Sequence, residues 1–230
     1  MGRNLGCWSV ALPLCAVVFA APPAVAQVPP SARQVAAYAG LLAAAQRGDL
    51  EQIKALLAKK APLEERDADR RTALHVATFA RQRETIRLLV AAGADLNALE
   101  YQRYDPVTIA AVANDEETLA LLLKLGASAK NVTSPYDGTA LIAAAHLGHV
   151  GVVRQLIAAG APLDHVNNLH WTALIEAVVL GDGGLQHTEI VRMLLGAGAN
   201  PAIGDRDGNT PLALAKARGY QEMARWLGRR

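Results

Sequence analysis

Apolar residues occur along the chain in pairs of short runs, and the members of each pair are separated by a polar or glycine-containing corner. The second run of a pair ends in glycine four times, in LLVAAGA (88–94), LLLKLGA (121–127), QLIAAGA (155–161) and MLLGAGA (193–199). A glycine at this place supplies the left-handed residue that closes a helix. The pattern predicts units of two short antiparallel helices.

A three-residue signal stands before the first run of most units. It reads T-A-L or T-P-L at Thr72, Thr139, Thr172 and Thr210 and D-P-V at Asp105, so successive signals are 33, 34, 33 and 38 residues apart. Thr and Asp accept hydrogen bonds from the free N–H groups of a helix start, and proline suits the next position. The chain therefore has a period of 33 residues, with five surplus residues in the last step.

These repeats resemble the ankyrin repeat family. The best matches are ALHVA (73–77) with GADLN (93–97), AAAHLGHVGVVRQLIAAGA (143–161) and DRDGNTPLALAKARGY (205–220), on a period known for this family. The resemblance implies an all-α solenoid of about six helix-turn-helix units with short hairpin turns between repeats. The repeats are expected at residues 38–66, 67–99, 100–133, 134–166, 167–204 and 205–230.

Both ends of the repeat region depart from the family pattern. Lys60 replaces the terminal glycine of the first unit, and the last unit stops at WLGRR (226–230). We interpret both units as end caps, since only interior repeats have a neighbour on each side. The residues expected in the core between repeats are Leu88, Leu89, Leu121, Leu122, Leu156, Ile157, Leu194 and Leu195.

The first 26 residues have the layout of a secretory signal peptide. Arg3 precedes an apolar run over about residues 5–21, and Ala-Val-Ala ends at Ala26. We expect cleavage after Ala26, a short linker at 27–37 and an exported protein, periplasmic or secreted. A membrane anchor is the alternative, although prolines interrupt the run. A lipoprotein at Cys15 is another, although the preceding residue is a leucine where a small one is needed.

Composition narrows the function classes. Hydrophobic residues make up 52% and aromatic residues 4% of the chain, which favours thin, closely stacked helical layers. Both cysteines, Cys7 and Cys15, lie in the predicted leader, so the mature chain would hold no disulfide, catalytic thiol or cysteine-ligated zinc. Without Arg3, 22 basic residues face 21 acidic ones. We therefore expect neither a nucleic-acid partner nor, after cleavage, a membrane.

The family resemblance implies that a protein partner binds the concave side, formed by the turns and the exposed positions of the first helices. Aromatic residues with nearby arginines are typical anchors of interfaces. The alternative is that the aromatic residues only pad the turns against neighbouring repeats. The candidate residues on the turns are Arg71, Tyr101, Gln102, Tyr104, Tyr136, Asn168, Trp171, Arg206 and Asn209, and those on the first helices are Phe79, His146, Glu176 and Arg218.

No motif of an enzyme, nucleotide-binding loop or calcium loop is present, so we expect a noncatalytic protein without a cofactor. The histidine pair His146 and His149 raises the alternative of a metal site, which needs further converging ligands. Two other functions stay open. One is a regulator that responds to a small molecule or metal near His146, His170 and the Gly181 loop, and the other is an accessory protein or inhibitor of an enzyme.

The stretch VLGDGGLQHTEI (179–190) contains the five surplus residues, which are Asp182, Gly183, Gly184, Leu185 and Gln186. A phosphate-binding loop would follow a strand and carry a Lys or Ser/Thr partner, and this stretch joins two predicted helices without one. We interpret the five residues as an insertion that protrudes at an inter-helix corner and is a secondary candidate for partner contact. Its deletion should leave the fold intact.

Overall fold

The computed structural model describes residues 27–229, so the predicted leader lies outside the described residues. The described chain folds into thirteen helices; it forms no strand, and its only bridge pairs Thr133 with Gly138. After a short leading helix, α1 (Ala32–Ala37), the helices form six pairs. The first helices are α2 (Gly40–Arg47), α4 (Ala73–Phe79), α6 (Pro106–Val112), α8 (Ala140–Leu147), α10 (Ala173–Val179) and α12 (Pro211–Ala217). The second helices are α3 (Leu50–Ala58), α5 (Arg83–Ala91), α7 (Glu116–Lys124), α9 (Val150–Ala158), α11 (Leu185–Gly196) and α13 (Gln221–Leu227).

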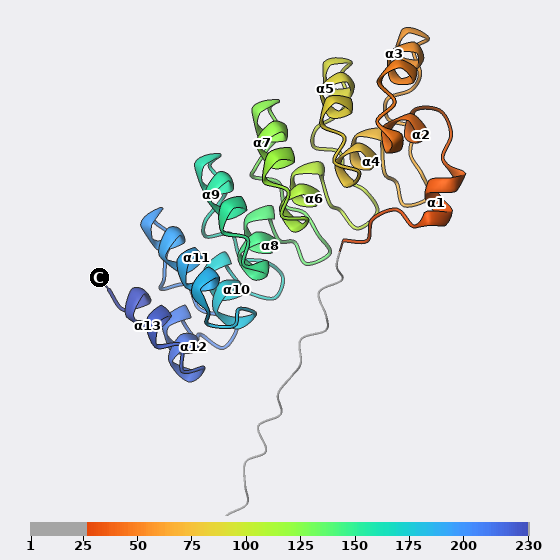
Figure 1. The fold of residues 1–230 in the computed structure, drawn as a ribbon. Coiled ribbons are helices and arrows are strands. Elements are labelled where there is room, and N and C mark those ends of the chain that lie inside the picture. The colour runs from red at the N-terminus through yellow and green to blue at the C-terminus, as the bar shows by residue number, and fades with distance from the viewer. Residues whose placement is uncertain (1–26, 230) are drawn as a thin grey trace, which may run out of the picture.

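The six pairs stack side by side in chain order and form two layers (Figure 1). Consecutive first helices pack against one another along the whole stack. In the other layer, α3 packs against α5, and α7, α9, α11 and α13 pack against one another in succession. Hairpin turns join consecutive pairs along the outer edge of the first-helix layer (Figure 1). The prediction of an all-helical solenoid of six units is confirmed.

The residues predicted to start and end the helices act as expected. Asp105 Oδ1 accepts a 2.7 Å hydrogen bond from the backbone N–H of Thr108, and the Thr139, Thr172 and Thr210 hydroxyls cap their helices in the same way. Beyond the second helices, Gly93, Gly126, Gly160 and Gly198 are left-handed, with φ between 75° and 101°. Lys60 takes this conformation in the first pair, with φ of 58°. A side chain there carries a strain that glycine avoids.

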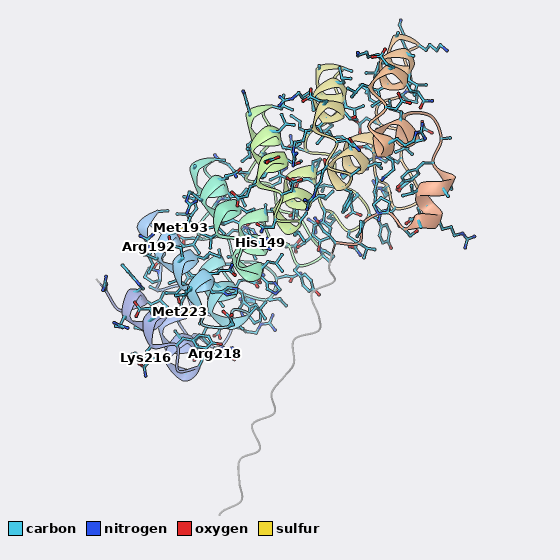
Figure 2. All side chains as sticks on the ribbon, viewed as in Figure 1. His149, Arg192, Met193, Lys216, Arg218 and Met223 are labelled. Atoms are coloured by element: carbon cyan, nitrogen blue, oxygen red, sulfur yellow. The ribbon has the colours of Figure 1, made fainter. Side chains whose placement is uncertain are left out.

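The core consists of small aliphatic side chains between the two layers. Leu89, Leu122, Leu156 and Leu194 are fully buried and Leu121 nearly so, while Leu88, Ile157 and Leu195 are partly buried against the same cluster. Met223 on α13 is fully buried and closes the stack at its C-terminal end (Figure 2). Burial of each such side chain stabilises the fold by roughly 1.5–3 kcal/mol. The predicted core residues are thus in or against the core.

The segment that we predicted to be a linker, residues 27–37, is ordered against the first turn. Ser31 and Gln34 form a reciprocal capping box at the start of α1. The Tyr38 hydroxyl, just after α1, donates a 2.7 Å hydrogen bond to Asp67, and Arg71 donates one of 2.9 Å to the carbonyl of Val28. Within residues 27–229, no hairpin turn precedes the first helix pair, and this segment is hydrogen-bonded to the turn that follows that pair. It is an N-terminal cap of the stack.

Candidate functional site

Each of the five hairpin turns is organised by one polar side chain at its first position. Asn167 Oδ1, for example, accepts hydrogen bonds of 3.0 Å from the backbone N–H groups of Leu169 and Trp171. The side chains that accept in this way, two and four residues ahead, are Asp67, Glu100, Ser134, Asn167 and Asp205. They follow the same spacing as the helix starts, and this regular spacing is a signal in the sequence from which they could have been predicted.

The first four turns are hydrogen-bonded to one another through their backbones, and the Arg206 side chain donates to the carbonyl of Asn168 at the last junction. The N–H of Tyr101 donates to the carbonyl of Asp69 at 2.8 Å, and the N–H of Asn168 donates to the carbonyl of Tyr136 at 2.9 Å. An ion pair of 2.6 Å between Arg103 and Asp137 adds to the link between the middle turns. The turns 67–71, 100–104, 134–138, 167–171 and 205–209, with the first helices behind them, thus form one continuous surface, which we call the hairpin face.

Most of the predicted partner-binding residues are accessible on the hairpin face. Tyr101 is the most prominent, with 70% of its surface exposed. Gln102, Tyr136, His146 and Trp171 are partly exposed, and Asn168, Arg206, Asn209 and Arg218 are exposed. Lys216 lies on α12, the first helix of the last pair, and Arg218 follows directly after that helix (Figure 2). The aromatic side chains of Tyr101, Tyr136 and Trp171 therefore reach solvent from three successive turns.

Arg71 is buried, contrary to our prediction of an exposed anchor. Its guanidinium pairs with Asp67 at 3.3 Å and Asp69 at 2.8 Å and lies over the half-buried ring of Phe79, 5.7 Å from the centroid. The N-terminal cap covers it and accepts a hydrogen bond from it through Val28. Arg71 therefore holds the cap to the first turn and is not available to a partner.

Tyr104 is also buried, so its prediction as an exposed anchor is wrong. Burial, with a smaller effect of the nearby Glu100 carboxylate, raises the pKa of Tyr104 to about 12. Its backbone N–H donates to Glu100 at 3.1 Å, which fixes the residue at the end of the turn. The burial of Tyr104, unlike the exposure of Tyr101 on the same turn, agrees with the alternative that an aromatic residue pads the repeats.

Glu176 is buried, with 4% of its surface exposed, although we predicted an exposed position on its helix. Its Oε1 accepts a 3.0 Å hydrogen bond from Asn167 Nδ2, while its Oε2 is buried without a hydrogen-bond partner. Burial raises the pKa of Glu176 to about 7. His146 Nδ1 lies 3.8 Å from Oε2, and burial, followed by the charge of His187, lowers the pKa of His146. The structure thus brings two predicted residues together, one buried and one partly exposed.

The remaining histidines act mainly as hydrogen-bonding braces. His75 accepts from the Thr72 N–H through Nδ1 and contacts the carbonyl of Ala98 through Nε2, at 3.1 and 2.9 Å. His149 and His187 reach carbonyls of the preceding repeats, those of Ala111 and His146 respectively. Within residues 27–229, no three His, Cys, Asp or Glu side chains are grouped as metal ligands would be.

The predicted insertion loop is shorter than five residues. Helix α11 starts at Leu185, so Leu185 and Gln186 belong to its first turn, and Leu185 is 91% exposed. Asp182, Gly183 and Gly184 form the corner before it, where Asp182 accepts hydrogen bonds from the N–H of Gly184 and the ring of His187. The glycines allow a tight corner because Gly183 is left-handed, with φ of 74°, and lies against the ring of Tyr220.

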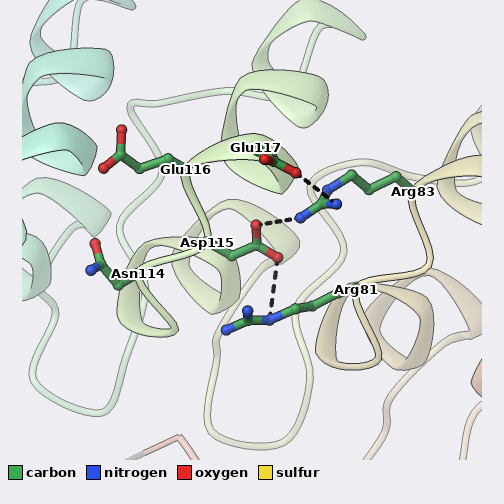
Figure 3. Close-up of a pocket in the computed structure, with 6 residues that line it drawn as sticks. All are labelled: Arg81, Arg83, Asn114, Asp115, Glu116 and Glu117. Atoms are coloured by element: carbon green, nitrogen blue, oxygen red, sulfur yellow. Dashed lines mark hydrogen bonds and ion pairs between the residues drawn. The ribbon is translucent and has the colours of Figure 1, made fainter.

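A surface hollow of about 390 Å³ lies at the inter-helix corners of the second and third pairs (Figure 3). Arg83 pairs with Asp115 at 2.9 Å and with Glu117 at 2.8 Å, and Arg81 approaches Asp115 at 3.5 Å. Burial acts to raise the pKa of Asp115, but hydrogen bonds from Thr118 and Arg83 outweigh it and hold the pKa below its ordinary value. Asp115 also caps α7, so this network joins two repeats, a link that we did not predict from the sequence.

Comparison with known proteins agrees with this architecture. The sequence model of ankyrin repeats (three copies) matches residues 41–133 and 107–204, most of the stack. The chain belongs to the ankyrin repeat family. An ankyrin repeat domain from Acinetobacter baumannii AYE is 45% identical, with a TM-score of 0.77, over 81% of this chain and 95% of that one. The ankyrin repeat protein EF0377 is 32% identical, with a TM-score of 0.74, over 83% and 96% of the two chains.

The putative ankyrin repeat protein YahD of Escherichia coli (strain K12) is 40% identical over 98 residues, which are 42% of this chain. The match spans 49% of YahD, so this chain covers about half the length of that relative. Ankyrin repeat domains generally mediate protein–protein interactions and are typically noncatalytic scaffolds. Among residues 27–229, no helix is long and apolar enough to cross a membrane.

Proposed function

We propose that this ankyrin repeat protein is a noncatalytic scaffold that binds a partner protein through its hairpin face. The observation that carries the proposal is Tyr101, a residue that is 70% exposed on a turn whose backbone is hydrogen-bonded to the neighbouring turn. Exposed aromatic side chains on fixed backbones are the residue type that anchors interfaces, because little entropy is lost when they are covered. Tyr136 and Trp171 are partly exposed residues on the next two turns.

The hairpin face is also built in advance of binding. Backbone hydrogen bonds link Asp69 to Tyr101, Arg103 to Ser134 and Tyr136 to Asn168, at 2.8, 3.2 and 2.9 Å. A surface that is ordered before it meets its partner loses less conformational entropy on association. The proposed mechanism is recognition by a preformed surface, with a few aromatic anchors supplying most of the affinity.

We also propose that the protein works outside the cytoplasm after removal of residues 1–26. The support is the sequence layout of that segment, with one early basic residue, an apolar run and Ala-Val-Ala before Gln27. Mass spectrometry of the protein from its native host tests this. A chain that starts at Gln27 in an extracytoplasmic fraction is expected, and a cytoplasmic chain that keeps Met1 or Gly2 would contradict it.

A capture experiment with crosslinking tests partner binding. The variant Tyr101→Ala/Tyr136→Ala/Trp171→Ala removes the exposed rings of the hairpin face, and Arg87→Ala/Lys124→Ala/Arg154→Ala is the matched control on the second helices, where all three residues are exposed. We expect the first variant to lose at least about 90% of the captured partner while the control keeps it, because anchor residues dominate binding. Equal capture by both variants, with both folded, would contradict the proposal.

A further inference from the structure

Glu176 presents a buried carboxylate oxygen that no described group satisfies. Its Oε1 accepts a hydrogen bond from Asn167, but no donor reaches its Oε2. The residue is buried, with 4% of its surface exposed. Proteins rarely leave a buried polar atom in this state, because the lost hydration is not replaced. A donor from a molecule bound at the hairpin face would supply the missing hydrogen bond.

A partly exposed histidine lies beside Oε2 on the hairpin face. Its nearest basic neighbour is His146, whose Nδ1 lies 3.8 Å away, beyond hydrogen-bond distance. The His146 side chain is 28% exposed, and within residues 27–229 no hydrogen bond holds its ring. The ring of His187, in contrast, is fixed between Asp182 and the carbonyl of His146. Displacement of the partly exposed His146 ring would be the route by which a ligand on the hairpin face reaches the buried Oε2.

We propose that Glu176 is the receptor for a basic side chain, lysine or arginine, of the partner protein, which reaches Oε2 beside His146. This inference rests on the proposed function and adds the chemistry of one contact. A cationic donor supplies both the missing hydrogen bond and the compensating charge, and charge-assisted hydrogen bonds are about twice as strong as neutral ones. A neutral hydroxyl or amide would leave the charge of the carboxylate uncompensated, and an acidic group would be repelled.

The other side chains around Glu176 fit a cationic ligand. Asn167 donates to Oε1 and so leaves Oε2 as the free acceptor. Burial lowers the pKa of His146, so its ring adds little positive charge at neutral pH to compete with a bound cation. Trp171, on the turn that leads into α10, and Tyr136, on the turn before it, are partly exposed residues of the same face. Aromatic rings near a carboxylate suit the long stems of lysine and arginine.

A selection from a phage-displayed library of random dodecapeptides tests the inference. In one arm, every round is preceded by depletion on the variant Glu176→Gln, so that peptides that do not need the carboxylate are removed. The second arm has no depletion. Glu51→Gln is the matched control, because Glu51 is an exposed acid on α3 paired only with Lys54. Thermal unfolding of each variant shows that it is folded.

The depleted arm should enrich peptides that share a lysine or arginine. Exchange of that residue for norleucine should weaken binding to the unmodified protein at least about tenfold, the effect of losing one charge-assisted contact, and should change binding to Glu176→Gln little. The control should bind as the unmodified protein does. Enriched peptides without a basic residue, an equal loss on both proteins, or no enrichment at all would overturn the inference.

The second arm separates this inference from the proposed function. If every enriched peptide binds Glu176→Gln normally but is lost on Tyr101→Ala/Tyr136→Ala, the result contradicts the role of Glu176 and supports the hairpin face as a binding surface. If no peptide responds to either change, both proposals fall.

A pH series gives an independent readout. Because the pKa of Glu176 is about 7, affinity for a selected basic peptide should rise about tenfold from pH 6 to pH 8. An unchanged or falling affinity would overturn the inference.

Discussion

Asn167 connects the fourth hairpin turn to Glu176 on α10. Its Nδ2 donates a 3.0 Å hydrogen bond to Glu176 Oε1, while its Oδ1 accepts from the N–H groups of Leu169 and Trp171. One buried amide therefore organises the turn and holds the carboxylate of the first helix behind it. The shape of the hairpin face and the position of its buried acid depend on the same side chain.

The variant Asn167→Ala should destabilise the protein by about 1–3 kcal/mol, because it leaves two backbone donors and a buried carboxylate oxygen unsatisfied. Asn168→Ala is the matched control. Asn168 is the next residue, exposed, and its amide only reaches the carbonyl of Pro135 at 3.1 Å. We expect its effect to stay within about 0.5 kcal/mol. Urea unfolding measures both, and equal effects would show that Asn167 does not organise the turn.

Glu176 should make stability fall as pH rises. Its pKa is raised by burial from 4.5 to about 7, so below pH 4.5 the carboxyl is neutral in both folded and unfolded chains. Between pH 4.5 and 7 the unfolded chain ionises first, which favours unfolding. The variant Glu176→Gln removes this effect. Its stability relative to the unmodified protein should increase by about 3 kcal/mol from pH 4.5 to pH 8.

Urea unfolding of the two proteins at several pH values measures this difference, since titrating groups far from Glu176 act equally on both. Glu51→Gln, at an exposed position, serves as the control and should show no such trend. A constant difference between Glu176→Gln and the unmodified protein would mean that Glu176 is ionised in the fold without penalty.

His75 should have the opposite pH dependence in acid. Burial lowers its pKa from 6.5 to about 4, and its Nδ1 must stay unprotonated to accept from the Thr72 N–H. As pH falls from 6.5 to 4, the unfolded chain binds a proton that the folded chain does not, so folding becomes less favourable by about 3 kcal/mol. Compared with His75→Gln, the unmodified protein should lose that much stability over this range. Parallel pH profiles of the two proteins would contradict the assignment.

Gly181, beside the insertion, and Gly196, at the far end of α11, should respond to alanine in opposite ways. A Cβ on Gly181 would lie 2.2 Å from the carbonyl oxygen of Ala177, and backbone cannot easily yield. Gly181→Ala should therefore destabilise the protein by more than about 2 kcal/mol. Gly196, in α11, has no atom within 4 Å of such a Cβ, so Gly196→Ala should stabilise it by about 0.5–1 kcal/mol. Thermal unfolding distinguishes the two, and similar shifts would contradict the described corner.

The sequence was sufficient to predict the stack because its signals are local and repeated. Helix starts at Thr139 or Asp105 and ends at Gly126 or Gly198 act within one turn of chain, so their meaning does not depend on distant residues. The departures are also local in origin. Lys60 takes a left-handed conformation that no residue preference predicts, and Ser31 with Gln34 starts a helix in a segment that we predicted to be a linker.

The hairpin face was harder to predict, because exposure there depends on contacts between segments far apart in sequence. Arg71 is covered by Val28, which is 43 residues away, and Glu176 is buried although we expected its position on α10 to face outward. The polar anchors of the turns were predictable in principle, since Glu100 and Asn167 follow the 33-residue period. The insertion lies at the inter-helix corner where we expected it, but its last residues, Leu185 and Gln186, extend a helix and do not form a loop.

Site-specific photocrosslinking in the native host tests the central claim most directly. A photoreactive amino acid placed at Tyr101, on the hairpin face, should give a discrete crosslinked partner, whereas the same residue placed at Arg87, exposed on α5 in the other layer, should give none. Crosslinks from position 87 alone, or none from position 101 in a folded and correctly localised protein, would contradict binding through the hairpin face.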